Sequence, residues 1–310
     1  MKVAVMLALV AVCAAPSTLA ASNSRGPGPP SVVPFCRSGF TVTLPTTRIV
    51  LVRGQTFGDL YQYGVPHPIR HTVAAGWRLD HRDVRGAVQL ANELLGIAET
   101  VTETGGRQIL YFPYLFDFPS RLGDMHPRWY SGMAQARIAG LFARLYEATG
   151  DHRWRTRAIE TYRSLTRVDP VRRVWHWEGT HRWIDTFSWA TPDPVLNGHL
   201  YAIVGLHDLW RITGVGETVL RQAIDTLGTQ GSRFMAAGGK HEYDLARSGI
   251  AGRYYSEIVW EQMQKIGVMA PCLAAAAKTF YDPADPQATF AAGIPLSGHA
   301  DSPSSKSYRQ

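Results

Sequence analysis

The 310-residue sequence has few of the short motifs that usually indicate an enzyme's chemistry. It contains no GxSxG nucleophile elbow, no HExxH zinc motif, no GxxxxGK phosphate loop and no GxGxxG dinucleotide loop. Its three cysteines include no CxxC pair, and Pro68 argues against a regular helix that would hold His67 and His71 as a ligand pair. The sequence therefore points away from serine hydrolases, zinc proteases and nucleotide-binding enzymes, and it predicts no metal site and no cofactor.

Charge is also sparse, because Asp, Glu, Lys and Arg make up 18% of the residues against 45% for the hydrophobic types. This is the balance of a globular protein, and it excludes wholesale disorder or a coiled coil. Lys and Arg outnumber Asp and Glu by 32 to 25, which gives a net charge of +7, but the positive residues are scattered rather than gathered in blocks. We therefore expect no nucleic-acid partner, whereas an acidic polysaccharide would suit a broadly positive surface.

Aromatic residues, in contrast, are abundant, with 9 Trp, 13 Tyr and 11 Phe. Carbohydrate sites stack sugar rings on such side chains, although most aromatic residues of a globular protein lie in its core. Four tryptophans gather in one short segment, at Trp175, Trp177, Trp183 and Trp189. We expect one or two of them to be platforms for a sugar and the others to belong to the core.

The N-terminus has the order of a secretory signal. Lys2 precedes an uninterrupted apolar stretch at residues 3–14, and mostly small residues follow at 15–21. The apolar stretch is too short to cross a bilayer, which needs about 20 such residues. The sequence thus predicts a signal peptide over residues 1–21, cut after Ala20 or Ala21, and a mature chain that is secreted and makes no stable membrane insertion.

Removal of the signal peptide would leave only two of the three cysteines. Cys13 would be lost, while Cys36 and Cys272 would enter an oxidising compartment. Two remaining cysteines in such a compartment favour a disulfide. We therefore predict a bond between Cys36 and Cys272 that ties an N-terminal arm to a late helix.

Hydrophobic periodicity predicts a mainly helical domain over residues 40–281, after a linker or arm at 22–39 and before a disordered tail at 282–310. Residues 40–53 alternate in part, which predicts one or two short strands. Helical spacing then recurs from about 83, at 131–149, from 151, at 197–212, at 217–227 and at 260–279, the last helix broken or kinked at Pro271. Two helices joined by a short turn are typical of an α/α toroid, here an incomplete (α/α)6-like barrel.

Five short segments in the same order carry a resemblance to a known family. They are residues 127–135 (PRWYSGMAQ), 191–198 (TPDPVLNG), 205–209 (GLHDL), 243–245 (YDL) and 262–264 (QMQ). This series resembles the C-terminal domain of the D-glucuronyl C5-epimerases, with weaker similarity from about Tyr63 to Leu273. The resemblance implies an α/α toroid and an enzyme that inverts C5 of glucuronic acid within a heparan-type chain.

The resemblance also implies catalytic tyrosines, and it carries over only in part. Tyr243 matches the tyrosine of the Tyr-Asp-Leu segment. A second family tyrosine falls on Phe187, which has no hydroxyl, and an acid two residues before it is matched by Asp185. The third falls on Glu261 in a count without gaps or, with a shortened loop, on Tyr255, which we prefer because loops absorb deletions readily. The implied catalytic residues are therefore Tyr243, Tyr255 and Asp185.

Further residues are candidates for binding the substrate. We expect Phe187, Tyr243 and Tyr255 to converge on one cleft, because their positions match the family's order around the toroid. A tyrosine needs a nearby cation to act as a base at neutral pH, a role for Arg247 or Arg253. Asn197 is expected to cap the helix that it begins. The full set of substrate-binding candidates is Tyr130, Gln135, Phe187, Asn197, Arg247 and Arg253.

Three functions follow from these residues, and the first is our main prediction. A uronate C5-epimerase would act on a uronic-acid-containing polysaccharide. A polysaccharide lyase or a glycoside hydrolase is the second, and a hydrolase would use carboxylates among Asp185, Glu257 and Glu261. The third is an inactive polysaccharide-binding protein, which the loss of a hydroxyl at Phe187 favours. The sequence leaves open the polymer, a structural calcium ion, and whether the chain forms a homodimer.

Overall fold

The computed structural model describes residues 33–52, 58–119, 124–189, 191–235, 242–245 and 252–284, which belong to one compact unit. The predicted signal peptide, Arg247 and nearly all of the predicted tail lie outside the described residues. The described part contains eight α-helices and three small two-stranded sheets. The prediction of a mainly helical fold with a few short strands is therefore confirmed.

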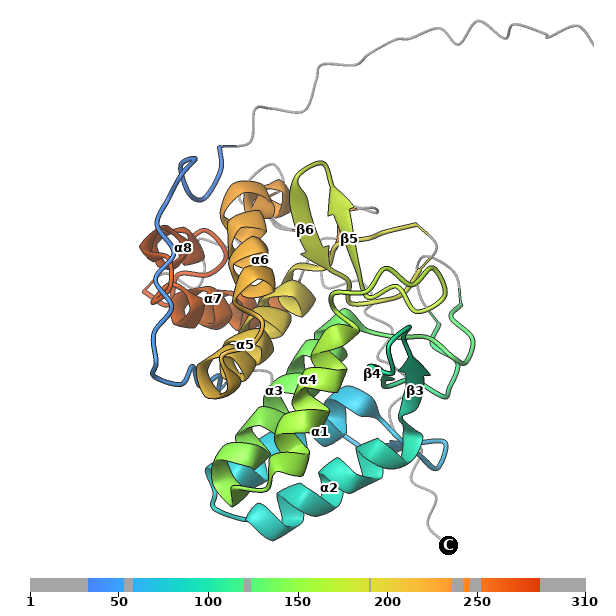
Figure 1. The fold of residues 1–310 in the computed structure, drawn as a ribbon. Helices are drawn as coiled ribbons and strands as arrows, with labels where there is room; N and C mark the ends of the chain where they lie inside the picture. The colour runs from blue at the N-terminus through green and yellow to red at the C-terminus, as the bar shows by residue number, and fades with distance from the viewer. Residues whose placement is uncertain are drawn as a thin grey trace, which may run out of the picture. The chain divides into compact units, whose positions relative to one another are not determined.

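The helices form four consecutive hairpins, each made of two helices in contact (Figure 1). The first helices of neighbouring hairpins also contact one another in the order α1, α3, α5, α7, so the hairpins follow one another as an open arc. We interpret this arc as part of an α/α toroid. The helices are α1 (Pro68–Asp80), α2 (Val84–Ile97), α3 (Gly132–Thr149), α4 (His152–Arg163), α5 (Leu196–Thr213), α6 (Glu217–Gln230), α7 (Arg253–Ile266) and α8 (Pro271–Ala277).

Local capping chemistry explains the turn between α3 and α4. The Ser131 hydroxyl accepts a hydrogen bond from the backbone N–H of Ala134 at the start of α3. Gly150 ends that helix with φ of 71°, in the left-handed region that glycine adopts without strain. Asp151 then caps α4 by accepting from Arg153 N. These residues are the boundaries that the sequence predicts.

Helices α3 and α5 approach closely in the middle of the arc. A Cβ atom added at Gly140 would lie 2.6 Å from the carbonyl oxygen of Gly205, and one added at Gly205 would lie 2.4 Å from that of Ala136. Real Cβ atoms do not tolerate such contacts, so glycine is required at both positions. The close approach fixes how the beginnings of α3 and α5 lie relative to each other.

The structure corrects several predicted boundaries. Helix α7 begins seven residues before the predicted start at 260, and the predicted break at Pro271 is the start of the separate helix α8. Pro68 likewise opens α1, which the sequence analysis missed, because proline is favoured at the first position of a helix. Asn197 is already inside α5, whose N-cap is Val195, so the predicted capping role is wrong.

Strands occur where they were not predicted. Residues 40–52 contain no strand, so that prediction is wrong for the described residues. Three antiparallel hairpins lie elsewhere, and a 3-10 turn at Gly231–Phe234 follows α6. The strand pairs are β1 (Tyr61–Gln62) with β2 (Val65–Pro66), β3 (Glu99–Thr102) with β4 (Gln108–Tyr111), and β5 (Trp175–Glu178) with β6 (His181–Ile184).

Residues 33–52 form an extended arm that is fastened to the helices. Cys36 and Cys272 form a disulfide, with Cα atoms 5.4 Å apart, that joins the arm to α8. Hydrogen bonds continue along the arm, from Thr43 N to Met269 O and between His207 Nε2 and Pro45 O, each 2.8 Å long. The arm thereby brings Arg48 to Asp80, at the end of α1. No helix in the described ranges has both the length and the apolar character needed to cross a membrane.

Candidate functional site

The beginnings of α3, α5 and α7 are joined through two loop segments, residues 185–189 and 242–245. The first N–H of α3, at Gly132, donates to the Asp185 carbonyl at 2.7 Å. At the start of α5, the Asn197 N–H donates to the Tyr255 hydroxyl of α7 at 3.1 Å. A Cβ atom at Gly198 would clash with Thr186, so the first loop lies directly on α5. We call this region the tyrosine end.

Tyr243 and Tyr255 lie together at the tyrosine end, as predicted. Their ring centroids are 5.0 Å apart, both side chains are partly exposed, and the Tyr255 hydroxyl donates to the Tyr243 carbonyl at 3.4 Å. Hydrogen bonding between Leu245 N and Pro194 O holds the Tyr243 segment against the entry to α5. Burial of the Tyr255 hydroxyl, together with neighbouring Tyr243, raises its pKa well above the ordinary value of 10.0. Tyr255 therefore stays protonated at neutral pH.

Asp185 lies at the same end but is fully buried. One of its carboxylate oxygens is 2.7 Å from His176 Nδ1, and the other is 3.7 Å from Arg173 Nε. Burial raises the pKa of Asp185, while His176 and Arg173 oppose that rise. Asp185 is thus placed to orient His176. The sequence analysis did not identify His176 as a candidate residue. The β5–β6 pairing, which was not predicted from the sequence, sets His176 opposite Trp183, two residues before Asp185.

Phe187 belongs to an aromatic surface rather than to the tyrosine pair. It stacks on Phe118 with centroids 5.3 Å apart, and its centroid is 4.6 Å from that of Trp189. All three side chains are partly exposed, and Trp129 packs beneath Phe118 and Phe187. Of the four clustered tryptophans, Trp189 is therefore the one that joins this surface, and Trp183 is fully buried in the core. An exposed aromatic surface of this kind can stack a sugar ring.

Two predicted binding residues are buried, and their polar groups form hydrogen bonds inside the protein. Gln135 is fully buried, and its amide accepts from Phe112 N and donates to Leu110 O and Ser164 Oγ. It therefore joins β4 and α4 to α3. Tyr130 is only 2% exposed, and its hydroxyl donates to a Glu99 oxygen at 2.8 Å. Both residues are structural in this arrangement, because their polar groups are used inside the protein.

Of the two arginines expected to activate a tyrosine, the structure describes only Arg253. Arg253 is exposed and donates to Glu257, one turn along α7, at 3.0 Å. The alternative catalytic position, Glu261, is buried and accepts a hydrogen bond from Val52 N of the arm at 2.6 Å. Arg247 lies outside the described residues. No group of three or more His, Cys, Asp and Glu side chains in the described ranges could hold a metal ion.

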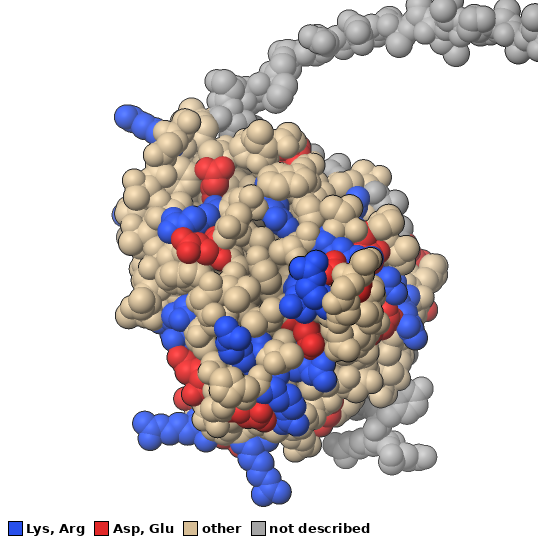
Figure 2. All heavy atoms as spheres, in the orientation of Figure 1, with Lys and Arg blue, Asp and Glu red and all other residues tan. Residues whose placement is uncertain are grey.

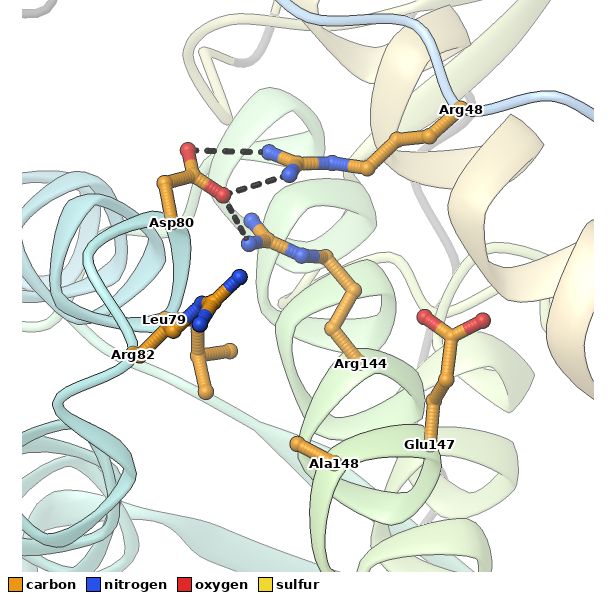
Figure 3. Close-up of a pocket in the computed structure, with 7 residues that line it drawn as sticks. All are labelled: Arg48, Leu79, Asp80, Arg82, Arg144, Glu147 and Ala148. Carbon is orange, nitrogen blue, oxygen red and sulfur yellow. Dashed lines mark hydrogen bonds and ion pairs between the residues drawn. The ribbon is translucent and has the colours of Figure 1, made fainter.

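A second polar region lies at the opposite ends of the same helices. A pocket of about 340 Å³ opens where α1 and α3 finish, and we call it the arginine pocket (Figure 3). Asp80 pairs with Arg48 of the arm through both oxygens and with Arg144 of α3, while Glu147 pairs with Arg211 of α5 at 2.7 and 2.9 Å. No motif indicated this pocket, whose lining is Arg48, Leu79, Asp80, Arg82, Arg144, Glu147 and Ala148.

The fold and the site define a mainly helical protein of successive helical hairpins, with loops gathered where α3, α5 and α7 begin. A comparison with protein families identifies the family. The family described as D-glucuronyl C5-epimerase C-terminus matches residues 106–270, just over half of the chain. The chain therefore belongs to this family. The matched range contains Asp185, Tyr243 and Tyr255 but stops short of the arm and of α1.

Proposed function

We propose that this protein is a uronate C5-epimerase that converts D-glucuronate units of a polysaccharide to L-iduronate. The family match supports an epimerase, and the observation that carries the proposal is the partly exposed Tyr243–Tyr255 pair where α5 and α7 begin. Helix beginnings carry partial positive charge, so this end suits the carboxylate of a uronic acid.

The reaction requires two proton transfers on opposite faces of the sugar. A base takes the C5 proton, and the electron pair of the broken C–H bond is delocalised into the adjacent carboxylate. A second group then delivers a proton to C5 from the other face, which inverts the centre with no net loss of atoms. In our proposal Tyr243 is one of the two groups, because its side chain is partly exposed.

The tyrosine pair itself cannot enclose a sugar ring. Non-bonded carbon atoms pack at about 3.5–4.0 Å, so a ring held between two aromatic side chains needs about 7 Å between them. The Tyr243 and Tyr255 centroids are only 5.0 Å apart, and the sugar must approach the pair from one side. Tyr255, with its raised pKa, then stays protonated and supports Tyr243 without transferring a proton itself.

His176 is our candidate for the second face. It lies on β5, and its Nδ1 is held 2.7 Å from the buried Asp185 carboxylate, an arrangement that orients an imidazole for proton transfer. Asp185 is in this proposal a positioning residue, not the group that touches the substrate. The aromatic surface of Phe118, Phe187 and Trp189 would hold a neighbouring sugar unit by stacking.

A polysaccharide-binding protein without activity is the second candidate function, and Phe187 favours it because this side chain has no hydroxyl to transfer a proton. One experiment separates the candidates. The mature protein is incubated in deuterated water with heparosan and with other glucuronate polymers, and the products are followed by NMR and by chain length. Deuterium at C5 with intact chains is the expected result. Chain scission would instead indicate a lyase or hydrolase, and binding without exchange an inactive protein.

Secretion is part of the proposal, since a polysaccharide of this class is met outside the cytoplasm. The disulfide between Cys36 and Cys272 suits an oxidising compartment. N-terminal sequencing of protein from the native host tests this point. A mature start at residue 21 or 22 is expected, and a start at Met1 would contradict export by signal cleavage.

A further inference from the structure

We propose that the arginine pocket is a second binding site, specific for an oxyanion, carboxylate or sulfate, carried by an acidic sugar. The pocket is separate from the tyrosine end, because α3 runs from Gly132 at that end to Arg144 in the pocket, a rise of about 18 Å. That the oxyanion belongs to the polymer substrate rests on the proposed function. That the pocket takes an oxyanion rests on its own residues.

The first argument is an excess of positive charge around the pocket. Asp80 is shared by Arg48 and Arg144, and Glu147 is engaged by Arg211. Figure 3 shows Arg48 and Arg144 directed at the same carboxylate, with Arg82 pointing into the space beside them. Arg82 is exposed and makes no ion pair with another described residue. The pocket lining thus holds three guanidinium groups and two carboxylates, and the charge of Arg82 is left for a ligand.

The groups behind the pocket increase this excess. Burial raises the pKa of Asp208, which weakens its contribution as an anion. Burial lowers the pKa of Arg144, and the nearby Arg48 lowers it further, so the charged forms of these two residues disfavour each other. Arg137 shows the same effect of burial. A bound oxyanion would relieve this repulsion and accept hydrogen bonds from the guanidinium groups.

The pocket has the size for one small ligand. Its volume of about 340 Å³ lies near the lower limit of ligand pockets, about 300–1,000 Å³. Helix ends attract cations, which alone can explain why Arg144 lies near the end of α3. This attraction does not explain Arg82, which lies beyond the end of α1. Arg82 has a left-handed backbone conformation, with φ of 62°, that residues other than glycine rarely adopt. Such conformations gather at functional sites, and this one directs Arg82 to the pocket.

The test measures sulfate binding to the full mature protein at low ionic strength by calorimetry, with D-glucuronate as a second probe. Arg82→Ala should weaken sulfate binding at least about tenfold, since it removes one charge-assisted contact, and should leave the melting temperature unchanged. Arg155→Ala is the matched control, because Arg155 lies on α4 away from the pocket and makes no ion pair with another described residue. Equal loss in both variants, or no sulfate binding by the unaltered protein, would overturn the proposal.

Two further measurements identify the source of the oxyanion and test whether the two sites are independent. A glucuronate polymer should displace sulfate from the unaltered protein, and failure to do so would overturn the assignment to an acidic sugar. Tyr243→Phe should bind sulfate with unchanged affinity, and loss of binding in this variant would show that the two ends are not separate. Sulfate binding that depends on Arg82 in a protein without C5 exchange would count against the proposed function alone.

Discussion

The two ends of the helical arc are built from different chemistry. At the tyrosine end, hydroxyl and backbone groups meet through hydrogen bonds such as that from Asn197 N to Tyr255, and aromatic side chains cover the surface. At the arginine pocket, guanidinium and carboxylate groups meet, and the apolar lining is limited to Leu79 and Ala148. The tyrosine end is suited to proton transfer in a partly buried site, and the arginine pocket is suited to binding a charged group.

The two ends also differ in how much of each lies within the range matched by the family. Residues 106–270 contain the tyrosine pair and its supports, whereas the arginine pocket draws Arg144 and Glu147 from the matched range and Arg48, Asp80 and Arg82 from outside it. The shared part of the family thus carries the proposed chemistry. The arm and the α1–α2 hairpin complete a pocket that the matched domain does not contain by itself. On the face seen in Figure 2, Lys and Arg lie among Asp and Glu rather than in one continuous area, so a confined pocket is the better candidate for anion binding.

The largest expected effect is a loss of C5 exchange when the tyrosine end is altered. Tyr243→Phe removes a proton-transfer group without changing the ring that packs on Tyr255, so C5 exchange should fall by about 10²–10⁴-fold while the fold is kept. Deuterium incorporation at C5 measures the change, and circular dichroism checks the fold. Tyr63→Phe is the control, because that side chain is 83% exposed and outside the site. Full exchange in Tyr243→Phe would remove Tyr243 from the mechanism.

Sequence reasoning predicted the helices best where local chemistry sets their ends. The predicted helix ranges 131–149 and from 151 agree with the structure, where the Ser131 cap, Gly150 and the Asp151 cap set these ends. The pairing of Tyr243 with Tyr255 was reached only through the family resemblance, since the two residues meet across a loop. Periodicity alone carried no information about that contact.

The errors have a common physical cause, which is that partners distant in the chain decide a side chain's role. Gln135 was expected in the cleft, but its amide is used by β4 and by Ser164 of the α4 hairpin. Asp185 was expected to be catalytic, and its burial against His176 is the reason that we propose a positioning role for it instead. The arginine pocket combines the arm, α1 and α3, and no short motif encodes such a combination.

The second expected effect concerns the arm and sharpens the comparison of the two ends. The disulfide closes a loop between residues separated by 236 positions, so Cys36→Ser with Cys272→Ser should cost about 2–5 kcal/mol of unfolding free energy, measured in urea. Loosening the arm should also weaken sulfate binding, because the arm supplies Arg48. Val171→Ser, at an exposed position away from the arm, is the control for surface substitution. Unchanged stability would show that hydrogen bonds alone hold the arm.

The smallest expected effect is a pH dependence with opposite sign at the two ends. Burial alone would raise the pKa of Asp80, but Arg48 and Arg144 bring it below its ordinary 3.8, and the hydrogen bonds from Arg211 lower that of Glu147 below 4.5. Groups with a lowered pKa stabilise the fold above these ordinary values, and that stabilisation is lost as the pH falls through the folded-state pKa. Asp185 has a raised pKa, so its contribution is present below 3.8 and is lost as the pH rises.

Asp80→Asn tests the pH dependence that comes from the arginine pocket alone. At pH 7 the variant should be less stable than the unaltered protein, since Arg48 and Arg144 lose their shared carboxylate. As the pH falls below the ordinary 3.8 the difference should shrink, because Asp80 is protonated first in the unfolded chain and only at a lower pH in the folded protein. Urea unfolding at a series of pH values measures it, with Asp225→Asn, an exposed carboxylate on α6, as the control. A difference that stays constant from pH 7 to pH 3 would mean that the charge of Asp80 does not stabilise the pocket, and that the arginines there are held by packing alone.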